Sequence, residues 1–428
     1  MNTTTSPSSS SSPAAGALDG LRVLDLSRVL AGPWCTQNLA DLGADVVKIE
    51  KPGAGDDTRH WGPPFFPDEH GQPTDEACYF AACNRNKRSV TVDMATPEGQ
   101  QLIRQLASSS DVVVENFKTG GLARYGLDYA SLSALNPRLV YCSVTGFGHT
   151  GPYAQRAGYD LLVQAMSGLM SITGHADGEA GGGPLRVGVA VIDLFTGMYA
   201  TTAILAALHA RERTGRGQHI DIALLDVAMA TLANQGASYL NADVVPQRQG
   251  NSHPSLVPYQ DFPTQDGRML LAIGNDGQFA RFCEAAGTDW AGDARFATNA
   301  ARVRHRQALV PLMSEVTRQR PTAAWIALLE DKAVPCGPIN DIGQAFDDPQ
   351  VRARGLRVAQ QRWPDGTPPA GRAVNTVVST ASPLRLSDTP VQLRHAPPAL
   401  GQHTEEVLRE HLGLDGERLA ALRARGVV

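Results

Sequence analysis

The 428-residue chain has few cysteines, scattered histidines and no long run of apolar residues. Its six cysteines include no Cys-x-x-Cys pair and are too sparse for a disulfide framework, so we expect reduced thiols and a cytoplasmic location. The eleven histidines show no His-Glu-x-x-His or comparable spacing, and we therefore expect no metal. Apolar runs are interrupted well before the ~18 residues that a membrane-spanning helix needs, except 194–208, which is short and rich in Ala and Thr. No membrane association is expected.

An excess of charge of one sign is also missing. The chain has 38 basic and 43 acidic residues, and its longest basic cluster covers only residues 84–88, so no nucleic-acid partner is expected. The turn after the first predicted strand lacks the Gly-x-Gly-x-x-Gly pattern that binds a dinucleotide pyrophosphate. We therefore expect no nicotinamide or flavin cofactor.

From Leu21 onward, short β-rich runs alternate with helical segments, which is typical of βαβ units around a mainly parallel sheet. The pattern predicts strands at 21–26, 45–50, 89–93, 111–115, 139–145 and 219–222, and helices at 32–42, 97–108, 194–213 and about 224–239. At the second helix, Thr96 supplies an N-cap and Pro97 the first helical position. The predicted fold class is α/β, with a Rossmann-like, doubly wound parallel sheet.

Composition divides the chain into segments. Residues 1–17, mostly Ser, Thr, Pro and Ala, are predicted to be a disordered tail. We expect 18–225 to form the N-terminal part of a large Rossmann-like domain and 250–335 a second, smaller α+β domain. Residues 226–249 are then a linker, and 336–428 a return linker and the C-terminal part of the large domain.

Asp193 is the only charged residue between Arg186 and Arg211, in an otherwise apolar stretch. Burying an unpaired carboxylate is costly, so this residue needs a role. It precedes an Ala- and Leu-rich helical pattern that closes at Gly215, where an aspartate is a common N-cap. The local sequence leaves two compatible roles open: a helix cap, or a nucleophile whose charge the helix N-terminus holds while apolar neighbours exclude water. A pKa raised by more than about three units would leave too little carboxylate near pH 7.

Basic residues recur after the predicted strands, at the edge where open α/β sheets bind ligands. Together they could neutralise a phosphorylated ligand, although each alone could be a solvated surface charge. They are Lys48, Lys51, Arg85, Lys87, Arg88, Lys118 and Arg124. Arg85, Arg156 and Arg186 are candidates to bind a substrate carboxylate, and an ordinary surface ion pair is the alternative for each.

A series of ordered motifs resembles the class III coenzyme A transferases, the CaiB/BaiF type. The motifs lie at 18–26, 31–33, 43–50, 55–59, 84–89, 114–117, 214–218, 335–338 and 400–404. The resemblance covers the chain from about Leu18 to its C-terminus. Within the family, residues 156–160, 193–197 and 257–259 are most similar to the enzymes that transfer CoA between succinyl-CoA and glutarate or hydroxymethylglutarate.

This resemblance implies a ping-pong enzyme that moves CoA from a donor acyl-CoA, succinyl-CoA by similarity, to a dicarboxylic acid such as glutarate or hydroxymethylglutarate. The family's catalytic aspartate falls on Asp193, which would carry CoA as an aspartyl thioester. Water competes at each step, so an apolar setting suits this residue. The resemblance also implies an interlocked homodimer.

The resemblance further implies that CoA lies across the first domain, with Ala31 by its thiol and Lys51 near its nucleotide. The expected CoA contacts are Leu30, Ala31, Lys51, Arg85, Lys87, Asn116, Phe117 and Arg124. Leu30 stands where formyl-CoA transferase has a glutamine, and the second domain shows no glycine-rich lid. Residues 181–183, three glycines, are interpreted as a flexible loop. A larger acid than formate or oxalate is therefore expected.

Two alternatives remain open. An α-methylacyl-CoA racemase of the same fold uses a His-Asp pair that would fall on Tyr159 and Asp160, and a tyrosine of pKa ~10 is a poor base at neutral pH. A CoA-binding homologue without catalysis is the other alternative, and the intact Asp193 argues against it.

Overall fold

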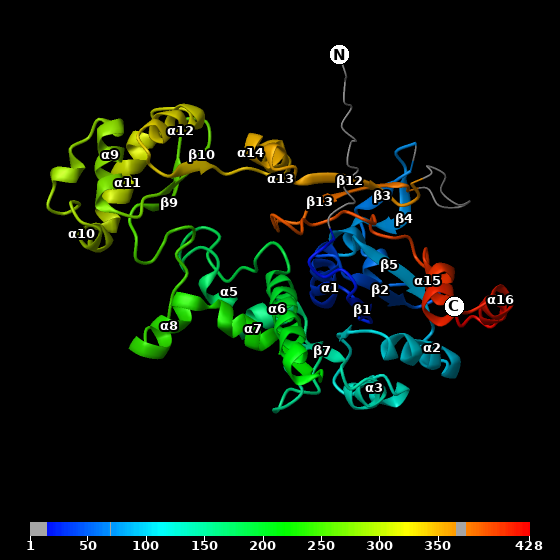
Figure 1. Ribbon diagram of the computed structural model, residues 1–428. Helices are drawn as coiled ribbons and strands as arrows, with labels where there is room; N and C mark the ends of the chain where they lie inside the picture. Colours follow the sequence, from blue (N-terminus) through cyan, green and yellow to red (C-terminus); the bar gives the residue numbers. More distant parts are fainter. Residues whose placement is uncertain (1–14, 69, 365–373) are drawn as a thin grey trace, which may run out of the picture. The chain divides into compact units, whose positions relative to one another are not determined.

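The computed structural model describes residues 15–68, 70–364 and 374–428, which form two units (Figure 1). The first unit contains the chain up to residue 167, residues 188–233 and the chain from 352 on, and the second contains 168–187 and 234–351. The predicted small domain falls inside the second unit, whereas the predicted linker 226–249 is divided between the two. Most of the predicted tail, residues 1–14, lies outside the described residues.

The first unit is built around a six-stranded parallel sheet with the strand order β5-β2-β1-β6-β7-β8. Its strands are β1 (Arg22–Asp25), β2 (Asp45–Glu50), β5 (Lys87–Thr91), β6 (Val112–Glu115), β7 (Val140–Thr145) and β8 (His219–Ala223). The chain adds strands to one side of β1 and then to the other, which places a switch point between β1 and β6. The predicted α/β class and the parallel sheet are confirmed.

Helices cover both faces of this sheet. On one face α1 (Ala31–Asp41) packs against α6 (Val191–Thr214), and the two lie side by side in Figure 1. On the other face the core joins side chains of the strands to those of α2 (Pro97–Ser108), α3 (Tyr129–Leu135), α15 (Thr404–Leu412) and α16 (Gly416–Ala424). The end of the chain therefore returns to the domain in which it began.

Shorter elements complete the first unit. They are α4 (Asp160–Met166), α7 (Leu224–Thr231) and two antiparallel pairs of strands, β3 (Phe65–Pro67) with β4 (Pro73–Ala77) and β12 (Arg357–Gln361) with β13 (Thr376–Thr380). The start of α2 is as predicted, because Thr96 Oγ1 accepts the Gly99 N–H at 3.0 Å and Pro97 follows the cap. The sequence analysis predicted no strand between 45–50 and 89–93, so it missed the β3–β4 pair.

The second unit has an antiparallel sheet of β9 (Tyr259–Pro263), β10 (Arg268–Ala272) and β11 (Cys336–Pro338) in the order β11-β10-β9. Phe262, Phe282 and Trp325 belong to its buried core. Its helices are α5 (Leu169–Ile172), α8 (Ala233–Ala242), α9 (Asp276–Ala286), α10 (Asn299–Arg304), α11 (Arg306–Thr317), α12 (Thr322–Asp331), α13 (Ile342–Asp347) and α14 (Pro349–Ala353). In the chain, α8 and α14 each cross from one unit to the other, since Ala233 and residues 352–353 belong to the first unit.

Helix α6 begins earlier than predicted. It starts at Val191, with Ala190 in the N-cap position, so Asp193 lies in its first turn and is not the N-cap that the sequence suggested. The helix ends, as expected, at Gly215 in the left-handed conformation (φ 69°). Among the described helices it is the one long and apolar enough to cross a membrane, by length and composition only. Its buried side chains include Ile192, Ala200 and Ile204.

Gly197 allows α1 and α6 to approach closely, because a Cβ there would lie 2.8 Å from the Ala31 carbonyl oxygen and 3.0 Å from Trp34 Cβ. We expect Gly197→Ala to lower the free energy of unfolding by about 1–3 kcal/mol through overpacking. Urea titration followed by circular dichroism measures the change. The control is Gly416→Ala, at a helical glycine whose Cβ would meet only a flexible arginine end at 3.5 Å. Equal effects of the two substitutions would contradict the close approach.

Candidate active site

A cavity of about 550 Å³ opens at the carboxyl ends of β1, β6 and β7, beside the switch point of the sheet. This is where doubly wound sheets bind their ligands. The lining residues are Arg28–Ala31, Asp57, Trp61, Asn116–Thr119, Val144–Gly146, Arg156–Tyr159, Asp193 and Leu224. Six residues predicted to contact substrate or CoA are thus brought together: Leu30, Ala31, Asn116, Phe117, Arg156 and Asp193.

The carboxylate of Asp193 is partly buried in the first turn of α6. Its burial, followed by the negative charge of Asp160, raises the pKa of Asp193 to about 7. This value is at the limit that the sequence argument allowed, since about half of the carboxylate is still ionised at pH 7. We had expected the helix N-terminus to hold the charge of Asp193. Instead, the N–H groups of Ile192 and Asp193 donate to Asp160 Oδ2, at 2.8 and 3.3 Å.

Asn116 fixes the turn that follows β1. Its Oδ1 accepts the Arg28 N–H at 2.8 Å and its Nδ2 donates to the Arg28 carbonyl oxygen at 2.6 Å. Val29, the next residue, has a φ of 70°, which is costly for a β-branched side chain and requires support from its surroundings. The turn leads directly into Leu30 and Ala31, so its conformation decides how the N-terminus of α1 faces the cavity.

A buried ion pair between Asp56 and Lys48 also stabilises this turn. The carboxylate oxygens of Asp56 accept the Val29 N–H, each at 3.2 Å, and Asp56 pairs with Lys48 at 2.9 Å. Lys48 Nζ also donates to the Ser27 carbonyl oxygen at 2.8 Å. Burial opposes ionisation of Asp56, but the charge of Lys48 and the hydrogen bonds from Lys48 and Thr58 together outweigh it and hold the pKa of that carboxyl below its usual value. Because a buried pair lacks competing water, it keeps the strained turn in one conformation.

Arg85 and Lys87 were expected to contact CoA, and the structure places them inside the protein instead. Arg85 Nε lies 2.9 Å from Asp41 Oδ1, and Lys87 Nζ lies 3.1 Å from Asp25 Oδ2. Both cations are buried, and neither lines the cavity. Buried carboxylates need such partners, so these two residues neutralise interior charge in place of the predicted contact with CoA.

Four of the other predicted cations lie at the surface. Lys51 and Arg124 are exposed outside the cavity lining, with the Arg124 guanidinium 4.5 Å from the centre of the Tyr125 ring. Arg156 lines the cavity and lies over the ring of Tyr153, at 4.6 Å. Arg186 is exposed in the second unit. The ligand roles of these residues stay predictions.

Sequence reasoning missed Arg28, Asp57 and Trp61 as lining residues. Arg28 pairs with Asp57 at 3.0 Å, and its guanidinium lies 5.2 Å from the centre of the Phe117 ring. Asp57 belongs to the motif 55–59, which carried part of the family resemblance. That motif was the only sequence signal for this part of the lining. It contains two adjacent carboxylates, Asp56 and Asp57, and the sequence does not show that Asp56 is buried whereas Asp57 lines the cavity.

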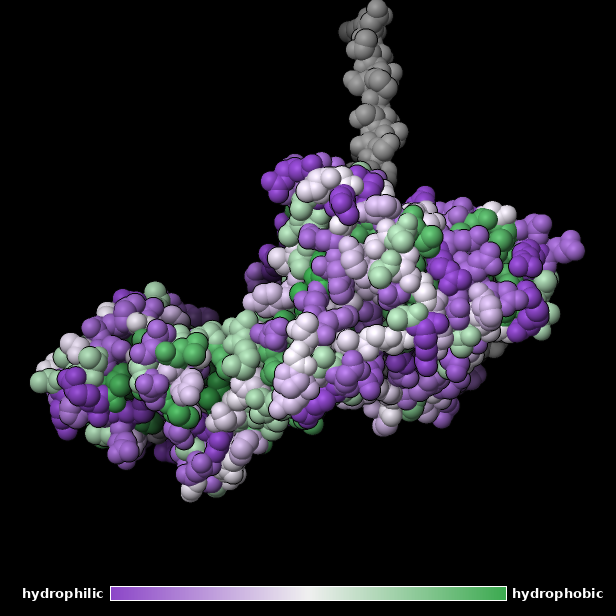
Figure 2. Space-filling model, turned by 90° about the horizontal axis from the view of Figure 1, so that it is seen from below, coloured by the Kyte–Doolittle hydropathy of each residue, from purple (hydrophilic) through white to green (hydrophobic). Residues whose placement is uncertain are grey.

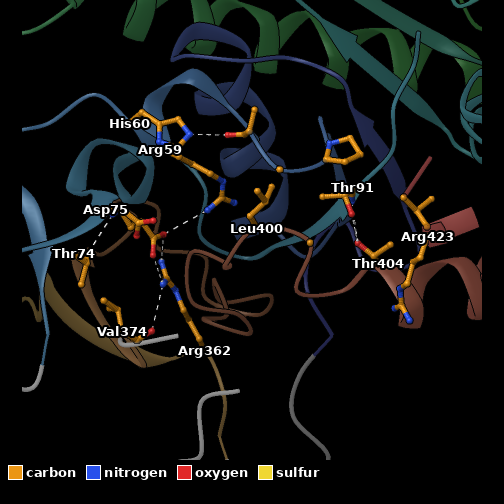
Figure 3. A pocket seen from close by; sticks show the side chains of 16 residues that line it. Arg59, His60, Thr74, Asp75, Thr91, Arg362, Val374, Leu400, Thr404 and Arg423 are labelled. Atoms are coloured by element: carbon orange, nitrogen blue, oxygen red, sulfur yellow. Dashed lines mark hydrogen bonds and ion pairs between the residues drawn. The ribbon is translucent and has the colours of Figure 1, made fainter. Parts of the chain in front are cut away.

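A second cavity of about 550 Å³ in the first unit has a polar lining (Figure 3). Each of its three arginines has a carboxylate partner: Arg59 with Glu50 at 2.7 Å, Arg362 with Glu76 at 2.6 Å and Arg423 with Glu405 at 3.0 Å. The charges of these arginines are therefore neutralised within the protein. We place the chemistry in the cavity that contains Asp193.

One group of possible metal ligands occurs among the described residues, Asp45, Glu410 and His411. The Arg88 guanidinium lies among them, 2.5 Å from Asp45, 2.6 Å from Glu410 and 2.7 Å from His411. The positive charge of Arg88 therefore already lies where a metal ion would bind.

Comparison with known proteins shows which family the chain belongs to. Residues 18–404 match the family model for CoA-transferase family III, so the chain belongs to that family and is a CoA-transferase. It is 51% identical to the succinate–glutarate CoA-transferase of Agrobacterium fabrum, over 92% of this chain and 95% of that protein. It is 42% identical to the succinyl-CoA:glutarate CoA-transferase of Homo sapiens, over 96% and 90%. The family predicted from the sequence motifs is confirmed.

A solved structure shows the same fold. The crystal structure of a CaiB/BaiF family protein from Brucella suis matches with a TM-score of 0.81 and 48% sequence identity, covering 93% of this chain and 100% of that one. The predicted large domain with its parallel sheet is therefore an arrangement that this family adopts.

Proposed function

We propose that the protein transfers CoA from succinyl-CoA to glutarate through an aspartyl-CoA thioester on Asp193. The observation that carries the proposal is the carboxylate of Asp193, which lines the cavity at the switch point and has a pKa raised to about 7 by its apolar setting and by Asp160. The names of the two CoA-transferases described above support the choice of succinyl-CoA and glutarate. The length and apolar character of α6 supply the dry surroundings that a reactive acyl intermediate needs.

The reaction consists of carboxylate and thiolate exchanges. The Asp193 carboxylate attacks the thioester carbonyl of succinyl-CoA, the C–S bond breaks, and a mixed anhydride and the CoA thiolate form. The thiolate then attacks the Asp193 carbonyl carbon, so that succinate leaves and the aspartyl-CoA thioester remains. Glutarate repeats these steps in reverse and departs as glutaryl-CoA. A carboxylate whose pKa is near 7 is more basic than an ordinary aspartate, and this strengthens it as a nucleophile.

The cavity offers CoA both apolar and cationic surfaces. Phe117 and Trp61 supply aromatic walls, and Arg28 and Lys118 are two of the three cations that line it, the third being Arg156. We propose that the first two of these cations bind phosphates of CoA in place of Arg85 and Lys87, whose charges are used inside the protein. Leu30 and Ala31 then border the thioester beside Asp193.

The contacts of Asp160 argue against the racemase alternative. A racemase would need Asp160 as an acid or base, whereas here its carboxylate accepts the N–H groups of Ile192 and Asp193 and the side-chain amide of Gln164. Its neighbour Tyr159 is 66% exposed. A carboxylate engaged by three donors is suited to holding structure rather than to proton transfer.

We also propose that a second copy of the chain covers an apolar face of the first unit, in a dimer of the interlocked kind. Helices α4, α6 and α7 contact one another and expose apolar side chains: Leu161 51%, Phe195 45%, Tyr199 46% and Met229 53%. Figure 2 shows apolar patches on one face of the molecule, among a mostly hydrophilic surface. Clustered apolar exposure marks an interaction surface. Light scattering should give twice the chain mass of 45.5 kDa; a monomer at micromolar concentration would contradict this.

The function is tested by mixing the protein with succinyl-CoA and single acids: glutarate, hydroxymethylglutarate, itaconate, malate, citramalate, formate and oxalate. We expect a new acyl-CoA with glutarate and little with formate or oxalate. A protein that binds CoA but gives no new acyl-CoA with any acid is the non-catalytic homologue. Exchange of the α-proton for deuterium without an acceptor acid indicates the racemase.

Arg156 lines the cavity, and we propose that it binds the distal carboxylate of glutarate. A hydrogen bond to a charged group is worth about 1.5–3 kcal/mol, so we expect Arg156→Ala to raise the KM for glutarate about tenfold to a hundredfold. Steady-state kinetics measure this effect. The control is Arg425→Ala, which removes an exposed arginine paired with Glu98. A KM unchanged in the Arg156→Ala variant would exclude Arg156 from this role.

A further inference from the structure

Asp160 connects the N-terminal ends of two helices beside Asp193. It is the first residue of α4, and its Oδ2 accepts the N–H of Ile192 at 2.8 Å and that of Asp193 at 3.3 Å, in the first turn of α6. Its Oδ1 accepts the amide of Gln164, which is fully buried one turn further along α4. Helix α6 has no cap from its own side chains, because Ala190 occupies its N-cap position. The backbone of Asp193 is therefore fixed by a residue of another helix.

We propose that Asp160 is a positioning residue for Asp193: its carboxylate fixes the backbone of the nucleophile, and its negative charge drives the transfer of CoA onto Asp193. This inference rests on the proposed function, in which Asp193 is the nucleophile. It adds that a second carboxylate, which never contacts CoA, sets the energy of the covalent intermediate.

The electrostatic surroundings of Asp193 make Asp160 its main charged neighbour. Asp160 is the charge that raises the pKa of Asp193, after burial. Tyr79, in a 3-10 turn (Cys78–Ala82), also faces this pair: burial and then the charge of Asp193 raise the pKa of Tyr79 to about 12, so its phenol stays neutral near pH 7. Helices α1 and α7 present Ala31 and Leu224 to the cavity, and neither side chain titrates. Among the cations that line the cavity, Arg156 is the one nearest to Asp160 along the chain.

The charge on Asp193 disappears when CoA is attached. Asp193 attacks as an anion, the C–S bond of the acyl-CoA breaks, and the thiolate then attacks the Asp193 carbonyl carbon. The C–O bond of the anhydride breaks at that carbon, and the negative charge leaves with the released acid. No proton is gained or lost. Two neighbouring carboxylates repel each other, and the repulsion ends when one of them becomes a thioester. Asp160 therefore favours the enzyme–CoA state.

The same repulsion acts on protonation and on thioester formation, because each neutralises Asp193. Removing the charge of Asp160 must then shift two equilibria together: the pH midpoint at which Asp193 becomes reactive, and the ratio of CoA-bearing to free enzyme. One pH unit in the midpoint corresponds to about a tenfold change in the ratio. If Asp160 had a purely structural role, the pH midpoint and the ratio of CoA-bearing to free enzyme would not shift by matching amounts.

Asp160→Asn tests this, because it keeps an oxygen for the α6 N–H groups and removes the charge. With succinyl-CoA and no acceptor acid, the rate of adduct formation on the Asp193 peptide is followed by mass spectrometry from pH 5 to 9. The adduct ratio is measured at pH 8.5 with fixed succinyl-CoA and succinate. We expect the midpoint to fall from about 7 by about one unit or more, and the ratio to fall by the matching factor, at least about tenfold.

Two further variants keep the test decisive. Asp160→Glu retains the charge but displaces the acceptor, so we expect a lower rate and a midpoint that stays near that of the wild type, even if Asp160→Asn does not fold. Asp226→Asn removes an exposed carboxylate from the first turn of α7 and should leave the midpoint and the ratio unchanged.

The outcomes separate the inference from the proposed function. If wild-type protein forms an adduct on Asp193 but Asp160→Asn leaves the midpoint and the ratio unchanged, the inference about Asp160 is wrong and the proposed function stands. If Asp226→Asn shifts them as much as Asp160→Asn does, the effect is not specific to Asp160, and the inference is again wrong. If the wild type carries no adduct on Asp193, the proposed function fails first.

Discussion

Replacement of Asp193 by asparagine is expected to abolish CoA transfer, with a loss in kcat on the order of 10⁴-fold or more. The amide has nearly the shape of the carboxylate, but its neutral oxygen cannot attack a thioester to form the anhydride. The measurement is the formation of glutaryl-CoA from succinyl-CoA and glutarate, followed by chromatography. The variant should still bind CoA, because the other residues that line the cavity are unchanged. Activity above about one hundredth of the wild type would contradict the role of Asp193.

The raised pKa of Asp193 gives the same substitution a second, opposite effect on stability. A folded-state pKa of about 7 above a model value of 3.8 means that the folded protein binds the proton more tightly. The stability from this group is present below pH 3.8 and is lost as the pH rises through about 7. Asp193→Asn should therefore stabilise the protein at pH 8, by at most about 4 kcal/mol, and much less at pH 4. Unfolding in urea at the two pH values measures this. A variant that is equally destabilised at both would contradict the assigned pKa.

Replacement of Asp56 by alanine is expected to cause the largest loss of stability. Asp56 and Lys48 form an ion pair in which both side chains are fully buried, at 0% exposure. Removing one partner leaves an uncompensated buried charge, which costs about 3–5 kcal/mol. The Val29 N–H loses its acceptor as well, so the turn at the cavity loosens. Urea unfolding gives the stability, and CoA transfer gives the effect on the turn.

Two variants separate the charge from the turn. Asp57→Ala removes a neighbouring carboxylate whose pair with Arg28 is half exposed, so its effect on stability should be below about 1 kcal/mol. The double variant Asp56→Ala with Lys48→Met should recover much of the stability but not the activity, because the Val29 N–H still lacks its acceptor. Full recovery of activity in the double variant would show that the acceptor at Val29 is unimportant for catalysis.

Elements with clear local signals were predictable from the sequence. The β-rich run Asp45–Glu50 predicted β2 with its bounds, and Thr96 with Pro97 predicted the start of α2. The start of α6 was not predictable, because its cap comes from Asp160 in another helix and Ala190 carries no cap signal. Because the capping residue lies 32 positions away along the chain, the residues around the helix start give no sign of it.

Among the basic residues that were expected at the ligand site, some were placed correctly from the sequence and others were not. Lys48 lies within β2, Lys87 begins β5 and Arg85 precedes β5, and all three pair with buried carboxylates. Lys118 follows β6 and lines the cavity. The expectation that these basic residues all follow strands, at the ligand-binding edge of the sheet, is therefore wrong for Lys48, Arg85 and Lys87. For Asp193 the sequence was more informative, because its isolation in an apolar run already suggested an apolar setting; the raised pKa itself comes from the structure.

The central claim is that Asp193 carries CoA, and the mass of the protein after mixing with succinyl-CoA alone tests it most directly. The account predicts a gain of one CoA on the peptide that contains Asp193, lost again when glutarate is added and absent in Asp193→Asn. CoA attached to Asp160 or to any other residue, or a succinylated enzyme without CoA, would contradict it.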